Sequence, residues 1–141
     1  MKKAYLLTLM ILIAGASFGQ NMSTLTISVS NIEVVGSKIF VALYDNEYSF
    51  NKKSGTVDSL RIIPKTKTAE VKFKNITPGN YAVAIFQDIN NNGILDINRI
   101  KIPQEPFGIS NYTTGKILGK PKFKNAQFHI SKDTAIIIPL Q

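Results

Sequence analysis

The sequence predicts an all-β fold, a single antiparallel β-sandwich of about seven strands with one long ordered loop. Apolar and polar residues alternate with a period of two, as where Leu25, Ile27 and Val29 are separated by Ser and Thr. Turn-forming residues interrupt these segments at short intervals, which is typical of sandwiches. Outside the N-terminus no segment keeps a helical period, so we expect strands rather than helices.

Each expected strand follows from its own pattern. Residues 24–30 and 69–74 alternate cleanly, which indicates one buried and one solvated face. Residues 37–45 and 81–86 are apolar on both faces, which indicates central strands. Residues 57–63 form a weaker candidate that ends at a proline. The full expected set is 24–30, 37–45, 57–63, 69–74, 81–86, 126–130 and 135–140.

A long excursion rich in Asn, Gly and Pro, from residue 88 to about 125, separates the fifth and sixth expected strands. Loops of this length in compact domains are usually functional or disordered. The excursion carries several large apolar residues that would pack back on the sandwich, which argues against disorder. These residues are Phe107, Ile109, Tyr112, Ile117, Leu118 and Phe123.

The N-terminus has the pattern of an export signal. Lys2 and Lys3 precede an apolar run at 5–14, and small residues then precede Gln20. We therefore expect a signal peptide at 1–19 and one β-sandwich domain at 20–141, located in the periplasm, on the cell surface or outside the cell. The alternative is a retained anchor, but the apolar run is shorter than the roughly 20 residues that span a bilayer. No later segment is apolar enough to cross a membrane.

The charge and the cysteine content of the chain exclude or disfavour several classes of function. The chain has no cysteine, which excludes disulfides, thiol catalysis and thiolate metal sites. Its formal net charge is +8, which favours contact with anionic envelope polymers in a salt-dependent way. The lysines are spread along the chain without a dense run beside aromatics, so we expect solvated faces rather than a nucleic-acid site.

Residues 88–96 suggest a specific ligand. Asp88, Asn90, Asn92 and Asp96 stand at positions 1, 3, 5 and 9 of a calcium-loop pattern, with Gly93 at position 6, where the chain must turn. Calcium prefers several such oxygen ligands at once. The pattern therefore predicts calcium as a cofactor, bound weakly with a Kd of about 10⁻⁴ M.

The second half of the calcium pattern is missing. Position 12 is Arg99 where a helical calcium hand needs a bidentate acid, so we expect Glu105, or Asp45 from the end of an earlier strand, to supply the missing carboxylate. The alternative is an Asn/Gly turn in which Asp88 and the Asn side chains cap backbone N–H groups.

A second candidate site is the segment with Phe107, Ser110, Asn111 and Tyr112, which would form a ligand-binding edge with Tyr48 and Phe50. Sandwiches often carry binding loops at their ends. The alternative is that Phe107 and Tyr112 pin the excursion to the sheet.

Catalysis has little support, and we assign no catalytic residue. Alternation directs His129, the only histidine, outward between Phe128 and Ile130. Asp88, Asp96 and Glu105 would be the acids of a hydrolase, but their Asn-rich surroundings suit ion coordination better.

Five ordered motifs resemble the family called domain of unknown function 2141, found in secreted bacterial proteins. They lie at 41–45 (Val-Ala-Leu-Tyr-Asp), 78–82 (Pro-Gly-Asn-Tyr-Ala), 88–96 (Asp-Ile-Asn-Asn-Asn-Gly-Ile-Leu-Asp), 102–111 and 120–126. The resemblance covers essentially the whole mature chain. It implies an immunoglobulin-like or transthyretin-like sandwich and an exported location, and the family has no established activity. The Asp-x-Asn-x-Asn-Gly-x-x-Asp loop is shared within the family.

These observations together predict an exported, non-catalytic binding or structural module of the cell envelope, whose partner is an envelope protein or a glycan. Two alternatives stay open. One is a carbohydrate-binding module that uses the loop aromatics. The other is a hydrolase that uses Asp88, Asp96 and Glu105.

Overall fold

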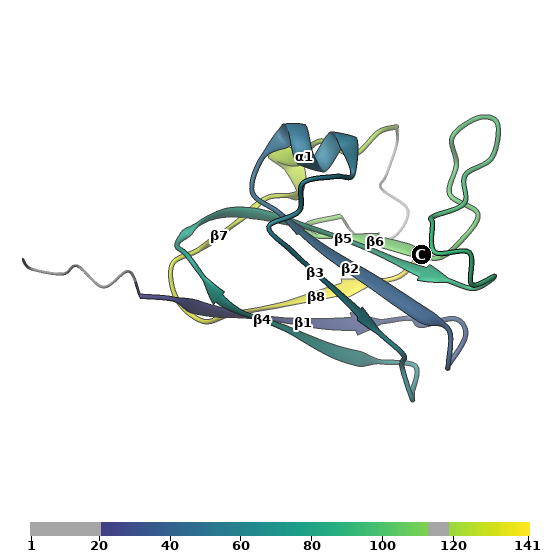
Figure 1. Cartoon of the computed structure of the whole chain (residues 1–141), viewed down its shortest axis with the longest axis horizontal. Coiled ribbons are helices and arrows are strands. Elements are labelled where there is room, and N and C mark those ends of the chain that lie inside the picture. The colour runs from purple at the N-terminus through teal and green to yellow at the C-terminus, as the bar shows by residue number, and fades with distance from the viewer. Residues whose placement is uncertain (1–20, 113–118) are drawn as a thin grey trace, which may run out of the picture.

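A computed structural model describes residues 21–112 and 119–141, where the chain forms two packed β-sheets with two short helices (Figure 1). The expected signal peptide at 1–19, Ile117 and Leu118 lie outside the described residues. The strands are β1 (Ser23–Ser30), β2 (Lys38–Tyr44), β3 (Asp58–Ile62), β4 (Ala69–Ile76), β5 (Gly79–Asp88), β6 (Phe107–Ile109), β7 (Phe128–Ile130) and β8 (Thr134–Pro139). The helices are α1 (Glu47–Lys52) and α2 (Phe123–Ala126). The predicted all-β sandwich is confirmed.

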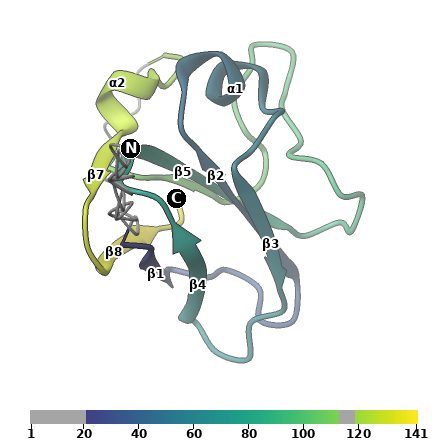
Figure 2. The same ribbon diagram turned by 60° about the vertical axis from the view of Figure 1, so that its left-hand side comes forward.

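One sheet has the strand order β4-β1-β8, and the other has the order β3-β2-β5-β6, with β7 also paired to β5. Figure 2 shows β1 between β4 and β8. The prediction of a purely antiparallel fold is wrong at one place, because β8 runs parallel to β1. The reason is that β7 belongs with the other sheet. The chain therefore changes sheets at residues 131–133 and enters beside β1 in the same direction.

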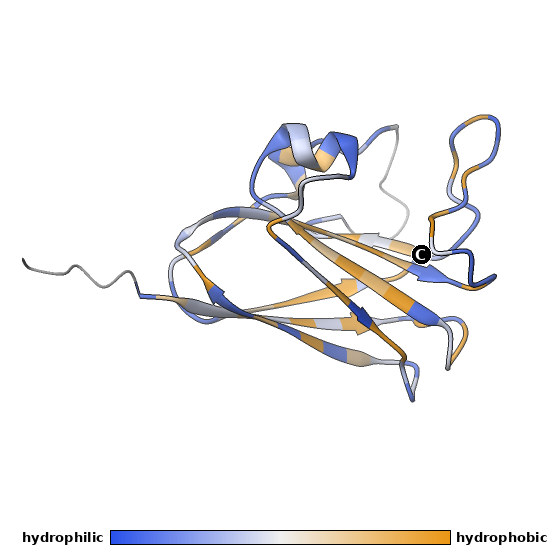
Figure 3. Ribbon diagram, viewed as in Figure 1, coloured by the Kyte–Doolittle hydropathy of each residue, from blue (hydrophilic) through white to orange (hydrophobic). Residues whose placement is uncertain are grey.

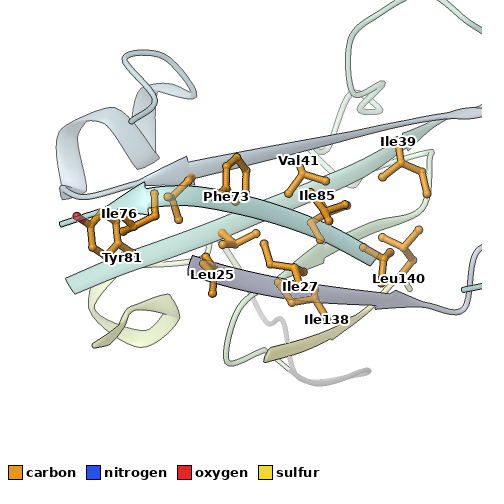
Figure 4. Close-up of a cluster of buried hydrophobic side chains, with 14 of the residues drawn as sticks. Leu25, Ile27, Ile39, Val41, Phe73, Ile76, Tyr81, Ile85, Ile138 and Leu140 are labelled. Carbon is orange, nitrogen blue, oxygen red and sulfur yellow. The ribbon is translucent and has the colours of Figure 1, made fainter. Parts of the chain in front are cut away.

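The main core fills the space between the two sheets. Alternate residues of β1 are fully buried and the residues between them are partly exposed, as the period of two predicts. Figure 4 shows Leu25, Ile27 and Ile138 facing Val41 and Ile85 of the other sheet. This apolar layer holds the framework from which the loops project.

A tyrosine fixes the turn from β4 to β5. The hydroxyl of Tyr81 donates to the backbone oxygen of Thr77 at 2.8 Å, across Pro78 and Gly79. Immunoglobulin-like sandwiches have a similar corner, in which a tyrosine hydroxyl bonds back to the backbone a few residues upstream. The corner fixes the chain at the start of β5.

A second apolar cluster lies on the outer face of the β2–β5–β6 sheet, beneath α1 and α2. Its buried members are Tyr44, Phe50, Ala82, Ile109, Phe123 and Ala126. The two helices were not predicted, because six and four residues are too short to show a helical period. The side chain of Asn46 begins α1 by accepting the N–H of Ser49 at 2.9 Å.

The excursion contains a strand that the sequence did not predict. Strand β6 pairs with β5, opposite Ala84, Ile85 and Phe86. Gly108 lets β6 approach β8 closely, because a Cβ there would lie 2.7 Å from a methyl group of Ile138. Strand β6 therefore divides the excursion into a loop at 88–106 and a return segment after 109.

Candidate functional site

The 88–106 loop begins at Asp88, the last residue of β5, whose side chain is only 1% exposed. Its two carboxylate oxygens accept the backbone N–H groups of Asn92 and Gly93, each at 3.0 Å. Gly93 has a φ of +82°, and the preceding turn residue Asn91 has a φ of +62°. Gly and Asn adopt this left-handed region most readily, which explains why the chain turns here.

The side chains of the turn meet at Asp96. The Oδ2 atom of Asp96 accepts the side-chain amides of Asn90 at 2.5 Å and Asn92 at 2.9 Å. The Oδ1 atoms of Asn90 and Asn92 accept backbone N–H groups two residues farther along the chain. The residues at positions 1, 3, 5 and 9 of the predicted pattern therefore belong to one hydrogen-bonded unit.

Glu105 ties the two ends of the loop together. Its side chain is 6% exposed, and it accepts the N–H of Ile89 at 2.9 Å and the N–H of Asp96 at 3.1 Å. Glu105 therefore lies beside the turn and bonds to its backbone, and its predicted role as a metal ligand stays a prediction. The backbone oxygen of Asp96 also accepts the N–H of Gln104 at 2.8 Å.

The expectation that Asp45 would be close to the loop is wrong. In the β2–β5 register Lys38 is opposite Asp88, whereas Tyr44 is opposite Ala82. Asp45 follows Tyr44, so it lies about 20 Å from the loop end of the sheet, at 3.3 Å per residue. Lys38 was not predicted to contact the loop, and its Nζ donates to Oδ1 of Asn91.

Two chemical consequences follow from this geometry. Each loop carboxylate accepts N–H groups of the loop itself, which stabilises the turn through charge-assisted hydrogen bonds. Among residues 21–112 and 119–141, no three acidic or histidine side chains are grouped so as to hold one metal ion. The turn is thus held by the same oxygen-bearing side chains that the calcium pattern predicts as ligands.

Beyond Asp96 the loop narrows to a hairpin-like end. Ile97 and Pro103 form an isolated bridge, and the N–H of Asn98 donates to the backbone oxygen of Ile102 at 2.9 Å. Oδ1 of Asn98 accepts the N–H groups of Ile100 and Ile102. The sequence analysis did not single out this end of the loop as a site. The signal that could have found it was isoleucine recurring among polar residues, in a segment where no strand was expected.

The second predicted site holds the excursion in place. The Oγ atom of buried Ser110 accepts the N–H of Val83 at 2.9 Å and donates to the oxygen of Ala126 at 2.7 Å. Asn111 donates to Gln127, and the hydroxyl of Tyr112 accepts the N–H of Lys122. Their polar atoms therefore bond to the neighbouring backbone.

The aromatic residues of this segment are not all on one surface. Phe107 and Tyr112 pack, partly buried, against the second apolar cluster, and Phe50 is buried within it. Tyr48 is exposed on α1. Phe107 and Tyr112 thus pin the excursion to the sheet, and the four aromatics do not share one exposed edge.

A basic pocket of about 380 Å³ lies beside the helices, lined by Glu47, Asn51, Lys120, Pro121, Lys122 and Lys124. Lys53 is nearby, with its ammonium 4.2 Å from the ring centre of Phe50. The pKa of Lys53 is lowered, first because surrounding atoms desolvate the ammonium and then because Lys120 repels it. Burial likewise raises the pKa of Tyr44.

His129 is exposed, as predicted, and its Nδ1 lies 2.9 Å from Oδ1 of Asn80. In the described part of the chain, none of the helices has the length and apolarity needed to cross a membrane.

Comparison with known proteins identifies the family. A family model described as an uncharacterised protein conserved in bacteria, DUF2141, matches residues 27–137. No curated protein and no solved structure matches the chain. The match extends from β1 to β8 and includes the whole 88–106 loop. This chain therefore belongs to the DUF2141 family, as its ordered motifs suggest.

Proposed function

We propose that the chain is an exported, non-catalytic binding or structural module of the cell envelope, and that calcium orders its 88–106 loop. One observation carries the proposal: the predicted ligand residues meet within a single loop that is anchored at buried carboxylates. Those residues are Asp88, Asn90, Asn92, Asp96 and Glu105.

The donor set is compatible with a hard cation. A carboxylate has about four lone-pair positions, and the hydrogen bonds of Asp88 and Glu105 occupy only some of them. The Oδ1 atoms of Asn90 and Asn92 each accept one backbone N–H, which leaves each amide oxygen a second lone pair for a cation. Calcium would replace the amide NH₂ donors as the partner of Asp96.

The contacts favour a structural role for the acids over hydrolysis. A general acid or base must exchange a proton with a substrate. Asp88 and Glu105 are both buried and hold backbone N–H groups of residues 89–96, in the first half of the loop. Release of either side chain for proton transfer would open the turn, so these groups suit a rigid scaffold.

The proposed location rests on the sequence of the N-terminus. Lys2 and Lys3 followed by a short apolar run are typical of an export signal. A chain without cysteine gains no stability from disulfides outside the cell. Ion binding in the loop would add stability there.

Thermal unfolding of residues 20–141, in chelator and then in millimolar calcium, tests the calcium proposal. With weak affinity we expect calcium to raise Tm by roughly 4 °C, from the mass-action stabilisation at about ten times Kd. The variant Asp96→Asn keeps the size of the side chain and removes its charge. We expect this variant to lose the calcium-dependent rise.

Glu33→Gln is the matched control, because Glu33 is exposed and lies between β1 and β2, outside the 88–106 loop. It should keep the full calcium response. If wild-type protein melts at the same temperature in chelator and in calcium, the loop is a capped turn without a cation.

A further inference from the structure

The far end of the 88–106 loop exposes an unusual number of large apolar side chains. We call residues 94–102 the isoleucine tip. The exposed fractions of its isoleucines are 62% for Ile94, 56% for Ile97, 74% for Ile100 and 51% for Ile102. Figure 3 shows apolar positions along the loop that projects from the sandwich. Single exposed apolar residues are ordinary, but a local group of them marks an interaction site.

An ordered backbone keeps the isoleucines of the tip exposed. Asn98 organises the turn, because its side-chain oxygen accepts the N–H of Ile100 at 3.0 Å and that of Ile102 at 2.9 Å. Lys101 has a φ of +63°, and its N–H donates to the backbone oxygen of Asn98 at 2.9 Å. The isoleucines between these bonded groups are therefore presented to solvent by a defined turn, at the end of the loop farthest from Asp88.

The charges of the loop are segregated. Asp88 and Glu105 are buried, and the Asp96 carboxylate accepts two amides of the turn. Beyond Asp96 the ionisable groups of the tip are Arg99 and Lys101, which are both exposed. Two of the three loop acids are thus buried, and the partly exposed Asp96 is engaged by the amides of the turn. Residues 97–102 offer the exterior a surface that is apolar and positively charged.

We propose that the isoleucine tip inserts into the interfacial region of an anionic lipid surface, with Arg99 and Lys101 beside the lipid phosphates. Apolar side chains flanked by cations bind such surfaces by combining burial of apolar area with attraction to negative headgroups. This inference deepens the proposed function by naming a partner for the loop. It rests on the envelope location, but not on calcium.

The size of the tip favours lipid over protein. A stable protein interface buries about 800 Å² on each partner and involves about 20–30 residues a side. The tip is a narrow projection of nine residues, and four of its other side chains are polar or charged: Asp96, Asn98, Arg99 and Lys101. A bilayer needs no matching partner surface, and a few apolar side chains at the headgroup boundary suffice to hold a charged peripheral protein.

Vesicle sedimentation tests the proposal with residues 20–141, which contain both sheets and their core. The probes are phosphatidylcholine vesicles with and without phosphatidylglycerol, both in chelator, so that the outcome is independent of the calcium response. We expect binding that requires phosphatidylglycerol and weakens with added salt. Ile100→Ser with Ile102→Ser should weaken binding about tenfold or more, and Arg99→Gln with Lys101→Gln should also weaken it about tenfold.

Matched controls come from the same chain. Ile63→Ser with Ile137→Ser removes two exposed isoleucines elsewhere, and Lys65→Gln with Lys74→Gln removes two exposed cations. These variants should bind as the wild type does. Circular dichroism should show that each variant is folded, which is expected because the tip hydrogen bonds use backbone N–H groups of Ile100 and Ile102.

Three outcomes of the sedimentation experiment overturn the proposal. They are no binding to anionic vesicles, equal binding to neutral and anionic vesicles, and an equal loss of vesicle binding in the tip and control variants. Tryptophan fluorescence gives a second readout, the depth of insertion. The chain has no tryptophan, so one introduced tryptophan reports on its own position alone. Ile100→Trp would add a single fluorophore, whose emission should shift to shorter wavelength and be quenched by brominated lipid. An unshifted emission in the presence of bound vesicles also contradicts insertion.

Discussion

At the scale of single residues, Glu105 links parts of the loop that are distant in sequence. One oxygen accepts the N–H of Ile89, and the other accepts that of Asp96. In Glu105→Gln an amide NH₂ would face one of these donors and leave a part-buried N–H unpaired. We expect a loss of about 1–3 kcal/mol in the free energy of unfolding, measured by urea titration in chelator. Glu33→Gln should change the free energy of unfolding by less than about 0.5 kcal/mol. An equal loss of stability in the two variants would contradict the role of Glu105.

Lys53 gives a pH-dependent expectation. Its folded-state pKa is lowered below 10.5, so between the two pKa values the unfolded chain binds more protons. Stability therefore rises with pH in that window, whereas the raised pKa of Tyr44 makes stability fall above pH 10. Urea unfolding at pH 8 and pH 10 should show that wild type gains stability relative to Lys53→Met, which retains Tyr44. A difference that stays constant or reverses would contradict this assignment.

The sequence predicted some residues of the site and missed others for a physical reason. The spacing of Asp88, Asn90, Asn92 and Asp96 is local, and a turn of nine residues brings them together whatever the rest of the fold does. The contact from Lys38 depends on the β2–β5 register. Exposure at the isoleucine tip depends on which segments the core leaves uncovered. Neither of these can be read from the spacing of residues.

At the scale of elements, the corner before β5 can be tested directly. Tyr81→Phe removes the hydroxyl that donates to the backbone oxygen of Thr77 and keeps the ring in the core. We expect a loss of about 1 kcal/mol in the free energy of unfolding. Tyr48→Phe is the control, because Tyr48 is exposed and should be neutral. If the two substitutions cost the same, the corner hydrogen bond adds nothing to stability.

Strands with clean alternation were the predictable elements. In β4 the buried Val71 and Phe73 alternate with exposed Glu70, Lys72 and Lys74, and this pattern alone identifies one face. Strand β6 has three residues around Gly108, so it contains too few positions to show a period. The parallel pairing of β1 and β8 depends on the route taken by a distant segment, which no local pattern encodes.

At the scale of the whole molecule, one of the two sheets supports both the helices and the 88–106 loop. Between them lies the main core, while the outer face of the β2–β5–β6 sheet carries α1, α2 and the second apolar cluster. The 88–106 loop leaves the same sheet at the far end of β5 (Figure 1). Because the sheet supports both structures, the proposed lipid contact and the basic pocket are held by one framework but lie at different ends of it.

The pairing of the first and last strands also governs when the domain becomes complete. Strand β1 lies between β4 and β8, so the apolar side chains of Leu25, Ile27 and Val29 lack part of their cover until Ile136 and Ile138 arrive. A nascent chain that emerges N-terminus first therefore cannot complete this sandwich before β8 has been synthesised. Under the export that we propose, this late closure would keep the sandwich incomplete until β8 is made, so that the chain could still cross a membrane in an unfolded form.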